Sequence, residues 1–407
     1  MTDDAVPPVR RATGLRPVIA ASVVATAGVL PVFLMGAVAV LVRAELGFTE
    51  ARLGLAVSAF FGLAALASIP SGFIVERLGD QWSLILGSVG SGVALIGMAT
   101  AWAWLPLFLW LGAAGLANSV SQLAANSRLA GGVPPDRQGL AFGIKQSANP
   151  LATLVGGLAV PLIALTLGWR WVFVFGAVIS LTAGVTMSQR RVARRPASAK
   201  RREPITIARR PLVILSIAVT FGAAAVTAMA AFVVEYAVHV GIEPGPAGFI
   251  LALGSVIGVS ARVGAGWLAD RLGRGSLKMV IVMVGSGVVA FAAFPLVDTL
   301  VPLAIVTVLA YVVAWGWPGL FNLAIIRGNR HAPAAATGIT QVGAYAGGVS
   351  GPFLFGLLVS QYGYSVAWWT ASGWLLVAAI LMFVGRVTAR RIWLQPVGDQ
   401  TGPATAS

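Results

Sequence analysis

Stretches without a charged side chain dominate the chain, and their lengths predict its architecture. Ten runs of at least 18 residues contain no Asp, Glu, Lys or Arg. A helix needs about 20 residues to cross the apolar core of a bilayer, so most of these runs predict one membrane-spanning helix each. The charge-free runs are 17–42, 53–75, 81–127, 146–169, 171–189, 211–234, 244–261, 279–297, 299–326 and 332–385.

Four of the runs need further interpretation. The run 81–127 is long enough for two helices and is interrupted by AWAWLP at 101–106. The run 332–385 is also long enough for two, and QYGY at 361–364 interrupts it. Two other runs begin or end at a single cation that interrupts what would be one crossing, Lys145 within 138–166 and Arg262 within 245–269. The pattern therefore predicts an all-α membrane protein with twelve transmembrane helices.

Composition excludes several classes of protein. Hydrophobic residues make up 58% of the chain and charged residues 10%, with a mean hydropathy of +0.88. Water-soluble domains carry about a quarter charged residues, so a soluble fold is excluded. There is no cysteine, and His239 and His331 lie far apart, so no group has metal-ligand spacing. The chain has no Gly-Lys dipeptide and hence no phosphate-binding loop. We expect no catalytic residue, metal, cofactor or ATP.

The net charge of +15 follows from topology. With a cytoplasmic N-terminus, only Arg43, Arg52 and Arg170 fall on the outer side, whereas the basic cluster 190–210 falls inside. This is the positive-inside bias that sets orientation in membranes. We therefore expect both termini in the cytoplasm of a bacterial inner-membrane protein. The surplus of positive charge favours contact with anionic lipid and does not indicate binding of nucleic acid.

Two segments of the first half of the chain recur in the second half. GFIVERLG at 72–79 matches GWLADRLG at 266–273, which lies 194 residues later. GIKQ at 143–146 matches GITQ at 338–341, which lies 195 residues later. The nearly equal offsets predict two pseudo-symmetric six-helix bundles. The predicted domains are a terminal segment 1–16, a bundle 17–189, a linker 190–210, a bundle 211–388 and a tail 389–407.

These features resemble the major facilitator superfamily of secondary transporters, whose halves are related by an axis along the membrane normal. The superfamily has a loop signature of the form G-x-x-x-D-R-x-G-R-[RK]. The second copy here keeps Gly266, Asp270, Arg271, Gly273 and Arg274. The first copy keeps Gly72, Arg77 and Gly79 but has Glu76 at the acidic position and Asp80 at the following basic one. The resemblance covers essentially the whole chain and implies transport by alternating access, and we expect a monomer.

The loop signature also predicts a cytoplasmic gate. An acid at a helix end can pair with a base on a neighbouring helix only while that face is packed shut. Arg128, at the end of helix four, is the candidate partner of Glu76, and Arg327, at the end of helix ten, that of Asp270. In the alternative interpretation these charges only mark the membrane interface.

Lys145 and Arg262 are the cations that lie within predicted spans. At about 1.5 Å per residue, each lies about 12 Å from the cytoplasmic end of its helix. A cation facing lipid at depth costs about 2.5–3.5 kcal/mol and is usually tolerated only beside a cavity or partner. Two cations at matching depth in opposite halves therefore predict a shared cationic cavity, in which Arg262 holds an anion by its planar fork and Lys145 closes from the other half. The alternative is that each side chain reaches back to the interface.

Polar and aromatic side chains complete the predicted cavity, although each equally suits contacts between helices. Asn149 follows Lys145 by one helical turn and shares its face. The other candidates are Asn118 and Gln122 on helix four, Trp315 before Pro318 on helix ten, and Gln341 and Tyr345 on helix eleven.

Two subfamily resemblances bear on the substrate. An Arg eight residues before the acid of the loop signature, as in RVGAGWLADRLGR at 262–274, resembles the oxalate/formate-exchanger and monocarboxylate branch. There a second cation lies on helix eleven, whereas here Thr340 occupies the position that matches Lys145. The run FGIKQSANPL at 142–151 is similar to the cyanate/nitroimidazole-porter branch, although Ala148 and Asn149 depart from its usual small residues.

Acids are scarce at membrane depth, and Glu235, with His239 one turn later, comes nearest to it. A proton-driven exporter of cationic drugs would need a buried carboxylate. The sequence therefore predicts a transporter of a small organic or inorganic anion, a carboxylate or a cyanate-like ion, by anion exchange or proton symport. The alternative is efflux of a neutral or weakly acidic drug such as a nitro-aromatic. A non-transporting sensor or a membrane enzyme is disfavoured, because no output domain or acid pair is evident.

Overall fold

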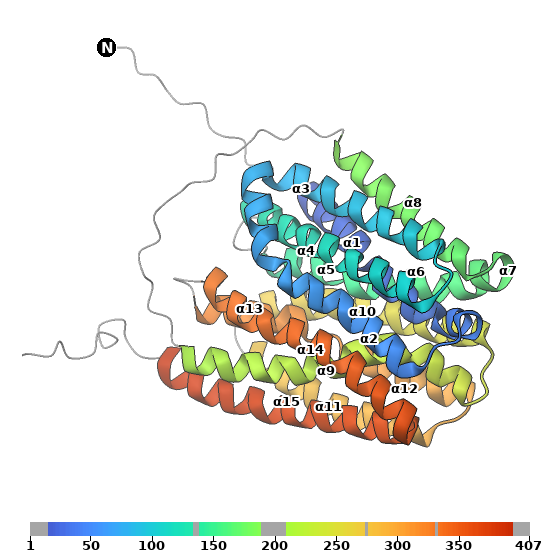
Figure 1. Ribbon diagram of the computed structural model, residues 1–407. Coiled ribbons are helices and arrows are strands. Elements are labelled where there is room, and N and C mark those ends of the chain that lie inside the picture. The colour runs from blue at the N-terminus through green and yellow to red at the C-terminus, as the bar shows by residue number, and fades with distance from the viewer. Residues whose placement is uncertain (1–14, 133–137, 189–208, 273–275, 330–332, 394–407) are drawn as a thin grey trace, which may run out of the picture.

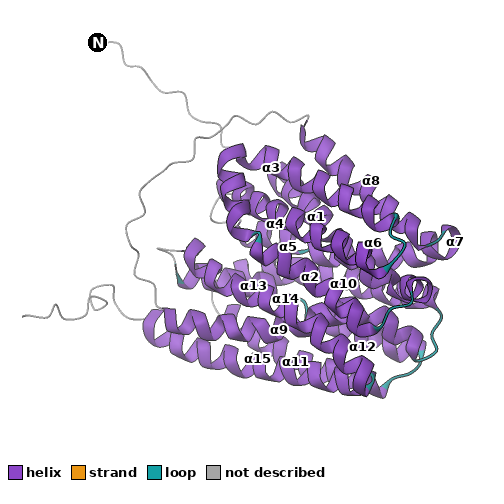
Figure 2. Cartoon of the chain, viewed as in Figure 1, coloured by secondary structure: helices purple, strands orange, loops and turns teal. Residues whose placement is uncertain are grey.

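The computed structural model describes residues 15–132, 138–188, 209–272, 276–329 and 333–393. The described chain consists of helices joined by short loops, as Figure 2 shows. The helices of the first half are α1 (Leu15–Leu46), α2 (Glu50–Leu66), α3 (Ser68–Ala99), α4 (Trp104–Gly132), α5 (Gln138–Gln146), α6 (Ala148–Ala159), the π-helical turn η2 (Val160–Ala164), α7 (Leu165–Leu167) and α8 (Trp169–Ser188). Those of the second half are α9 (Arg209–His239), α10 (Pro244–Leu272), α11 (Ser276–Ala293), the 3₁₀ turn η3 (Phe294–Leu296), α12 (Leu300–Val313), α13 (Pro318–Gly328), α14 (Pro333–Tyr362) and α15 (Tyr364–Trp393).

Eleven helical stretches of the described chain are long and apolar enough to cross a membrane. One of them, α3, contains the end of one pass and the whole of the next, because it reverses direction at Gly79, whose φ of 79° and ψ of 164° are not helical. Glycine carries no Cβ and adopts positive φ at little cost, which explains its place at this reversal. The second pass is therefore α2 continued by the start of α3, and the described chain makes the twelve passes predicted.

The passes form two groups of helices, α1–α8 and α9–α15, which lie above one another in Figure 1. The prediction of two six-helix bundles is thus confirmed. We call the helix ends next to the segment 189–208 the linker face, and the ends at 47–49, 100–103, 240–243, 297–299 and 363 the opposite face. The predicted segments 1–16, 190–210 and 389–407 lie largely outside the described residues, so their boundaries stay predictions.

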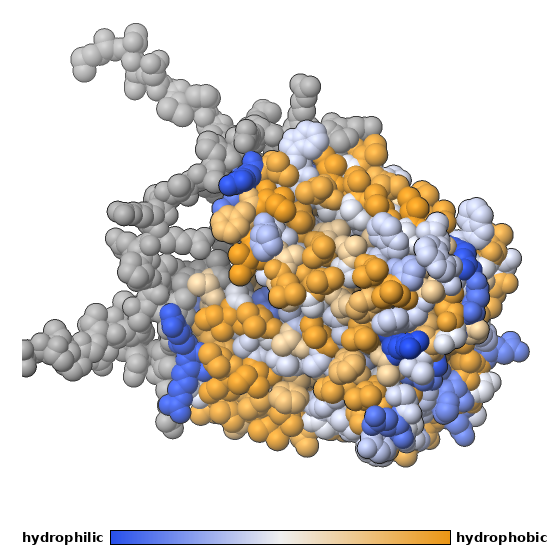
Figure 3. Space-filling view, viewed as in Figure 1, coloured by the Kyte–Doolittle hydropathy of each residue, from blue (hydrophilic) through white to orange (hydrophobic). Residues whose placement is uncertain are grey.

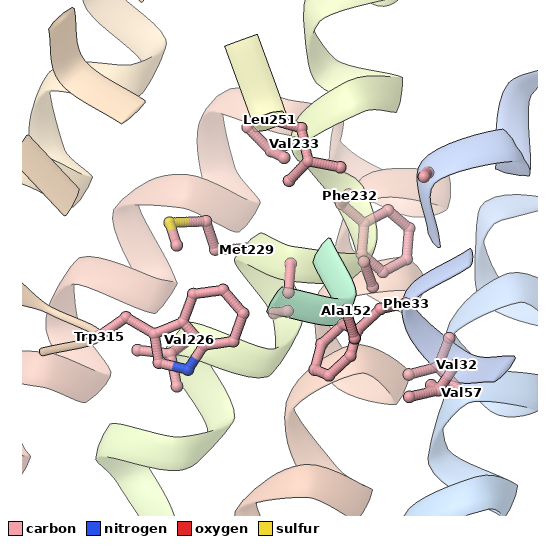
Figure 4. Close-up of a cluster of buried hydrophobic side chains, with 14 of the residues drawn as sticks. Val32, Phe33, Val57, Ala152, Val226, Met229, Phe232, Val233, Leu251 and Trp315 are labelled. Carbon is pink, nitrogen blue, oxygen red and sulfur yellow. The ribbon is translucent and has the colours of Figure 1, made fainter. Parts of the chain in front are cut away.

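Apolar side chains cover the outside of the helices and fill the contact between the bundles. Figure 3 shows a hydrophobic band whose two ends carry the hydrophilic side chains. Figure 4 shows buried side chains from both bundles meeting in the middle, among them Phe33, Val57, Phe232 and Trp315. Close packing of apolar groups from the two halves closes this part of the contact.

The seam between α2 and α14 is tight at the opposite face and loosens toward the linker face. A Cβ added to Gly54 would overlap the main-chain carbonyl of Pro352. Nearer the middle, a Cβ on Gly62 would lie 3.6 Å from the Val349 side chain, which is an ordinary contact. Toward the linker face, a Cβ on Gly72 or Gly338 would meet no atom within 4 Å. The structure is therefore closed at the opposite face.

Candidate functional site

Helix five of the first bundle is broken beside Lys145. Helix α5 ends at Gln146 and α6 begins at Ala148. Pro150 has no N–H group, so it cannot donate to the carbonyl four residues earlier, which is that of Gln146. The sequence KQSANP thus leaves one main-chain acceptor without its helical donor, at a half-buried position one residue after the lysine.

Helix ten of the second bundle is broken in the same way. Helix α12 ends at Val313 and α13 begins at Pro318. Residues 314–317 between them are not helical, so the Trp315 carbonyl lies outside the regular hydrogen bonds of the helix. Each bundle therefore supplies one main-chain carbonyl that a helix break has released.

Arg262 on α10 binds both released carbonyls. Its Nε donates to the Trp315 carbonyl oxygen at 2.9 Å, and its Nη1 donates to the Gln146 carbonyl oxygen. The guanidinium carbon also lies 5.4 Å from the centroid of the Trp315 ring, which favours a cation. The residue is only 3% exposed. Arg262 thus ties helix ten of its own bundle to helix five of the other.

These bonds alter the role predicted for Arg262. A planar fork that grips an anion needs two neighbouring nitrogens, but Nε and Nη1 are already occupied by carbonyls. Within the described chain, Nη2 is buried and has no hydrogen-bond partner. While both carbonyl bonds persist, the side chain offers an anion one nitrogen and not the two-nitrogen fork.

Lys145 immediately precedes Gln146, whose main-chain carbonyl Arg262 binds. It is 6% exposed, so it is buried and does not extend into solvent. Among the described residues, no hydrogen bond or ion pair satisfies its ammonium. The adjacent helices are close here, since a Cβ on Gly143 would lie 3.5 Å from the Arg262 carbonyl oxygen. The structure thus packs the segment of α5 that carries Lys145 against the part of α10 that carries Arg262.

Aromatic and hydroxyl side chains surround the guanidinium. The rings of Phe33 and Tyr311 lie 5.8 and 4.8 Å from that of Trp315, between centroids. The Thr153 and Ser255 hydroxyls, one from each bundle, are 2.7 Å apart. The Tyr311 hydroxyl is buried and has no partner among the described groups. The sequence reasoning missed Tyr311, although its place one helical turn before Trp315 was a usable signal.

The other predicted cavity residues lie in less informative places. Gln122 donates to the Ala25 carbonyl and to the Asn118 side chain, both at 3.2 Å, so these two polar groups join helices within the first bundle. Asn149 and Tyr345 are half-buried, and Gln341 is exposed. Contact of these five side chains with substrate stays a prediction.

The charges of the predicted gate are only partly described. Arg128 Nη1 lies 3.8 Å from Asp80 Oδ2, so the acid placed against it is Asp80 rather than the expected Glu76. The reason is the reversal at Gly79, which puts Asp80 at the start of the pass that packs on α4. A partly exposed pair at this distance contributes little stability.

The remaining gate residues are distributed as follows. Glu76 and Arg77 are exposed, Gly72 and Arg327 are half-buried, and Gly266 is buried. The Arg271 guanidinium carbon lies 4.0 Å from the centroid of the Trp267 ring. The side chain of Asp270 and all of Arg274 lie outside the described part of the chain. The gate therefore stays a prediction.

A buried acid lies at the opposite face, where the sequence indicated Glu235 only as the acid nearest to membrane depth. The Glu235 side chain is 1% exposed and forms an ion pair with Arg43 across the two bundles, with Nη1–Oε1 at 2.9 Å. Its ion-pair partner comes from the first half, about half the chain away, so no local pattern could show the pair. A buried carboxylate is therefore present, and the sequence-based argument against a proton-driven exporter, that such an acid is missing, does not hold.

Comparisons with known proteins agree with this architecture. Residues 18–342 match the model of the Major Facilitator Superfamily. An uncharacterised MFS-type transporter of Mycobacterium tuberculosis is 26% identical over 331 residues, which cover 74% of this chain and 72% of that protein. The multidrug resistance protein MdtG of Escherichia coli is 26% identical over 342 residues, covering 80% of this chain and 82% of that protein.

Solved structures show the same fold. A bacterial homologue of the human lysosomal transporter Spinster, in an inward-facing and unoccupied conformation, has a TM-score of 0.73 at 15% identity and covers 97% of this chain and 100% of that chain. A mutant of the nucleoside transporter NupG has a TM-score of 0.69 at 15% identity, covering 91% of this chain and 99% of that chain. With twelve passes in two bundles and a family match over most of its length, the chain belongs to the Major Facilitator Superfamily of membrane transporters.

Proposed function

We propose that this protein carries a small organic or inorganic anion, a carboxylate or a cyanate-like ion, between the two bundles by alternating access. The observation that carries the proposal is the unpaired Lys145 ammonium, which is buried one residue before the carbonyl that Arg262 binds. A buried charge is costly unless it is paired. No acid of the described chain pairs with Lys145, so an anion that enters from solvent is the partner that would compensate it.

The free nitrogen of Arg262 supports the same substrate class. Buried polar groups without partners are rare in folded proteins, and Nη2 is one of them. An anion between the Lys145 ammonium and this N–H group would satisfy both cations with charge-assisted hydrogen bonds. The movement of the anion is by exchange or by proton symport.

The orientation and location belong to the same proposal. The linker face is taken as cytoplasmic, because the basic cluster 190–210 adjoins it. Arg43, Arg52 and Arg170 lie toward the opposite face, which is then the outer one, in a bacterial inner membrane. The structure, closed at the opposite face, would then be closed toward the outside.

A second candidate function is efflux of a neutral or weakly acidic drug. Two observations favour it: the name of the relative MdtG, and the aromatic side chains of Phe33, Tyr311 and Trp315 around the guanidinium. Flat aromatic molecules could stack on such rings. In that case the cations would not be the main determinants of binding.

A ligand panel separates the two candidates. We expect organic acids or cyanate to raise the unfolding temperature of the purified protein, because a ligand that binds only the folded state stabilises it, by about 2.7 kcal/mol at 100 times Kd. The measurement is thermal unfolding with organic acids, cyanate, nitro-aromatics and drug cations, repeated on Lys145→Gln. Stabilisation by anions that the variant loses supports anion transport. Stabilisation by neutral aromatics alone, equal in both proteins, contradicts it and supports efflux.

A further inference from the structure

The ion pair of Arg43 and Glu235 joins the two bundles at the opposite face. Arg43 lies near the end of α1, and Glu235 near the end of α9. Nη1 of the arginine donates to both carboxylate oxygens, at 2.9 and 3.0 Å. The carboxylate sits one helical turn from Phe232, which is part of the apolar cluster between the bundles (Figure 4). Opening of this face therefore requires that the pair separate.

The two partners are not equally dependent on this pair. Arg43 keeps other acceptors within its own bundle, since Nη2 lies 2.6 Å from Glu50 Oε1 and Nε donates to the Phe48 carbonyl at 3.0 Å. These bonds do not cross between the bundles and survive their separation. The guanidinium therefore stays compensated when the opposite face opens.

Glu235 keeps much less. Within its own bundle, the described group that bonds to it is the Tyr364 hydroxyl, which donates to Oε2 at 3.3 Å. The other titratable groups nearby are Glu50, which repels a negative charge, and His239, whose exposed ring lies 4.7 Å from that of Tyr364. Tyr236 on the same helix is engaged elsewhere, with the Phe294 carbonyl at 2.6 Å. Without Arg43, the carboxylate is left without a base bonded to it.

A carboxylate in this position is relieved by binding a proton. A nearby positive charge favours the ionised form of an acid, so a carboxylate that loses its base binds a proton more readily. We propose that Glu235 is a proton-binding site linked to opening of the opposite face: it is ionised while Arg43 holds it, and it takes up one proton from solvent when the bundles separate there. When Arg43 returns, the proton is displaced. The site thus provides the proton-binding step that either symport or exchange for protons requires.

The sign of the pH dependence follows. The open form binds one more proton than the closed form, so lower pH favours opening. A difference of one proton changes the equilibrium by up to about tenfold per pH unit. The inference rests on the proposed function only in taking the opposite face as the outer one, and it concerns a site distant from Lys145.

Spin labels on the opposite face can measure this equilibrium directly. The chain has no cysteine, so Trp102→Cys and Thr299→Cys can be labelled without removing native thiols. Both positions are exposed, in loops of different bundles. The distance distribution would be recorded in proteoliposomes from about pH 8 to about pH 5, without substrate, so that a wrong substrate class cannot affect the result.

We expect the separated population to grow as pH falls in the parent and to lose its pH dependence in Glu235→Gln, whose amide cannot ionise. The matched control is Glu45→Gln, another acid of the opposite face whose pairs, with Arg170 at 2.5 Å and with Trp169 at 2.6 Å, stay within one bundle. His239→Gln tests the other titratable group. Both of these variants are expected to keep the parental response.

Infrared difference spectra between the two pH values give a second readout. The infrared band of a protonated carboxyl should be weaker in Glu235→Gln than in Glu45→Gln. The contribution of the other carboxyl groups is first subtracted from both difference spectra. A parent without pH response, a response that persists in Glu235→Gln, or one abolished by Glu45→Gln or His239→Gln would each overturn the proposal.

Discussion

The Lys145→Gln variant is expected to bind the transported anion about ten to 100 times more weakly than the parent. A hydrogen bond to a charged group contributes about 1.5–3 kcal/mol, and each 1.4 kcal/mol changes affinity tenfold. Lysine is the cleaner target of the two cations. Arg262 also holds the Gln146 and Trp315 carbonyls, so its loss would disturb the contact between the bundles as well as the site.

Folding should survive this change, because glutamine removes a buried charge that has no partner in the described chain. The measurement is anion binding and counterflow in proteoliposomes, with thermal unfolding to verify folding. Lys278→Gln is the matched control: it makes the same substitution at an exposed position at the start of α11 and should match the parent. Parental affinity in Lys145→Gln would show that the ammonium does not contact the substrate.

The Gly54→Ala variant is expected to shift the protein away from the state closed at the opposite face by about five- to 150-fold. The added methyl group would overlap the Pro352 carbonyl, and the main chain there cannot move aside as the end of a flexible side chain can. Overpacking of a close contact costs about 1–3 kcal/mol, and here the cost falls only on the closed state. Transport should fall strongly, because every cycle passes through that state.

A second glycine on the same seam provides the comparison. Gly62→Ala makes the same change eight residues further along, where the new methyl would lie 3.6 Å from the Val349 side chain, and we expect it to behave as the parent. Spin labels at Trp102→Cys and Thr299→Cys report the populations, and counterflow reports transport. Equal populations in the two alanine variants would mean that this contact does not limit closure.

The fold was predictable because charge avoidance alone determines where the chain can cross a membrane. Charge-free runs gave twelve passes, and a repeat offset gave the two bundles. The same reasoning located Lys145 and Arg262 at matching depth, because an intramembrane cation is conspicuous against an apolar background. These properties are encoded locally, residue by residue.

Partnerships across the bundles were not predictable in the same way. Pro150 shows from the sequence alone that the Gln146 carbonyl lacks its helical donor. That Arg262 donates to this carbonyl depends on how helix five packs against helix eight, which the sequence does not show. Glu235 lies just after a charge-free run in the sequence, and only the arrival of Arg43 from 192 residues away makes it a buried, bonded acid. Asp80 replaced Glu76 beside Arg128 because the turn at Gly79 determined which acid begins the next pass.

The two hydrogen bonds of Arg262 bear on how readily the protein changes conformation without a bound substrate. The guanidinium donates to a carbonyl of each bundle, so it links the two bundles across the α5–α10 contact. An anion that needs two nitrogens of this side chain must take one from a carbonyl, and thereby loosens this link. We then expect the change between conformations to be slow without substrate and fast with substrate bound. Binding of the substrate would thus permit its own transport. A carrier built in this way exchanges one solute for another more readily than it dissipates a gradient.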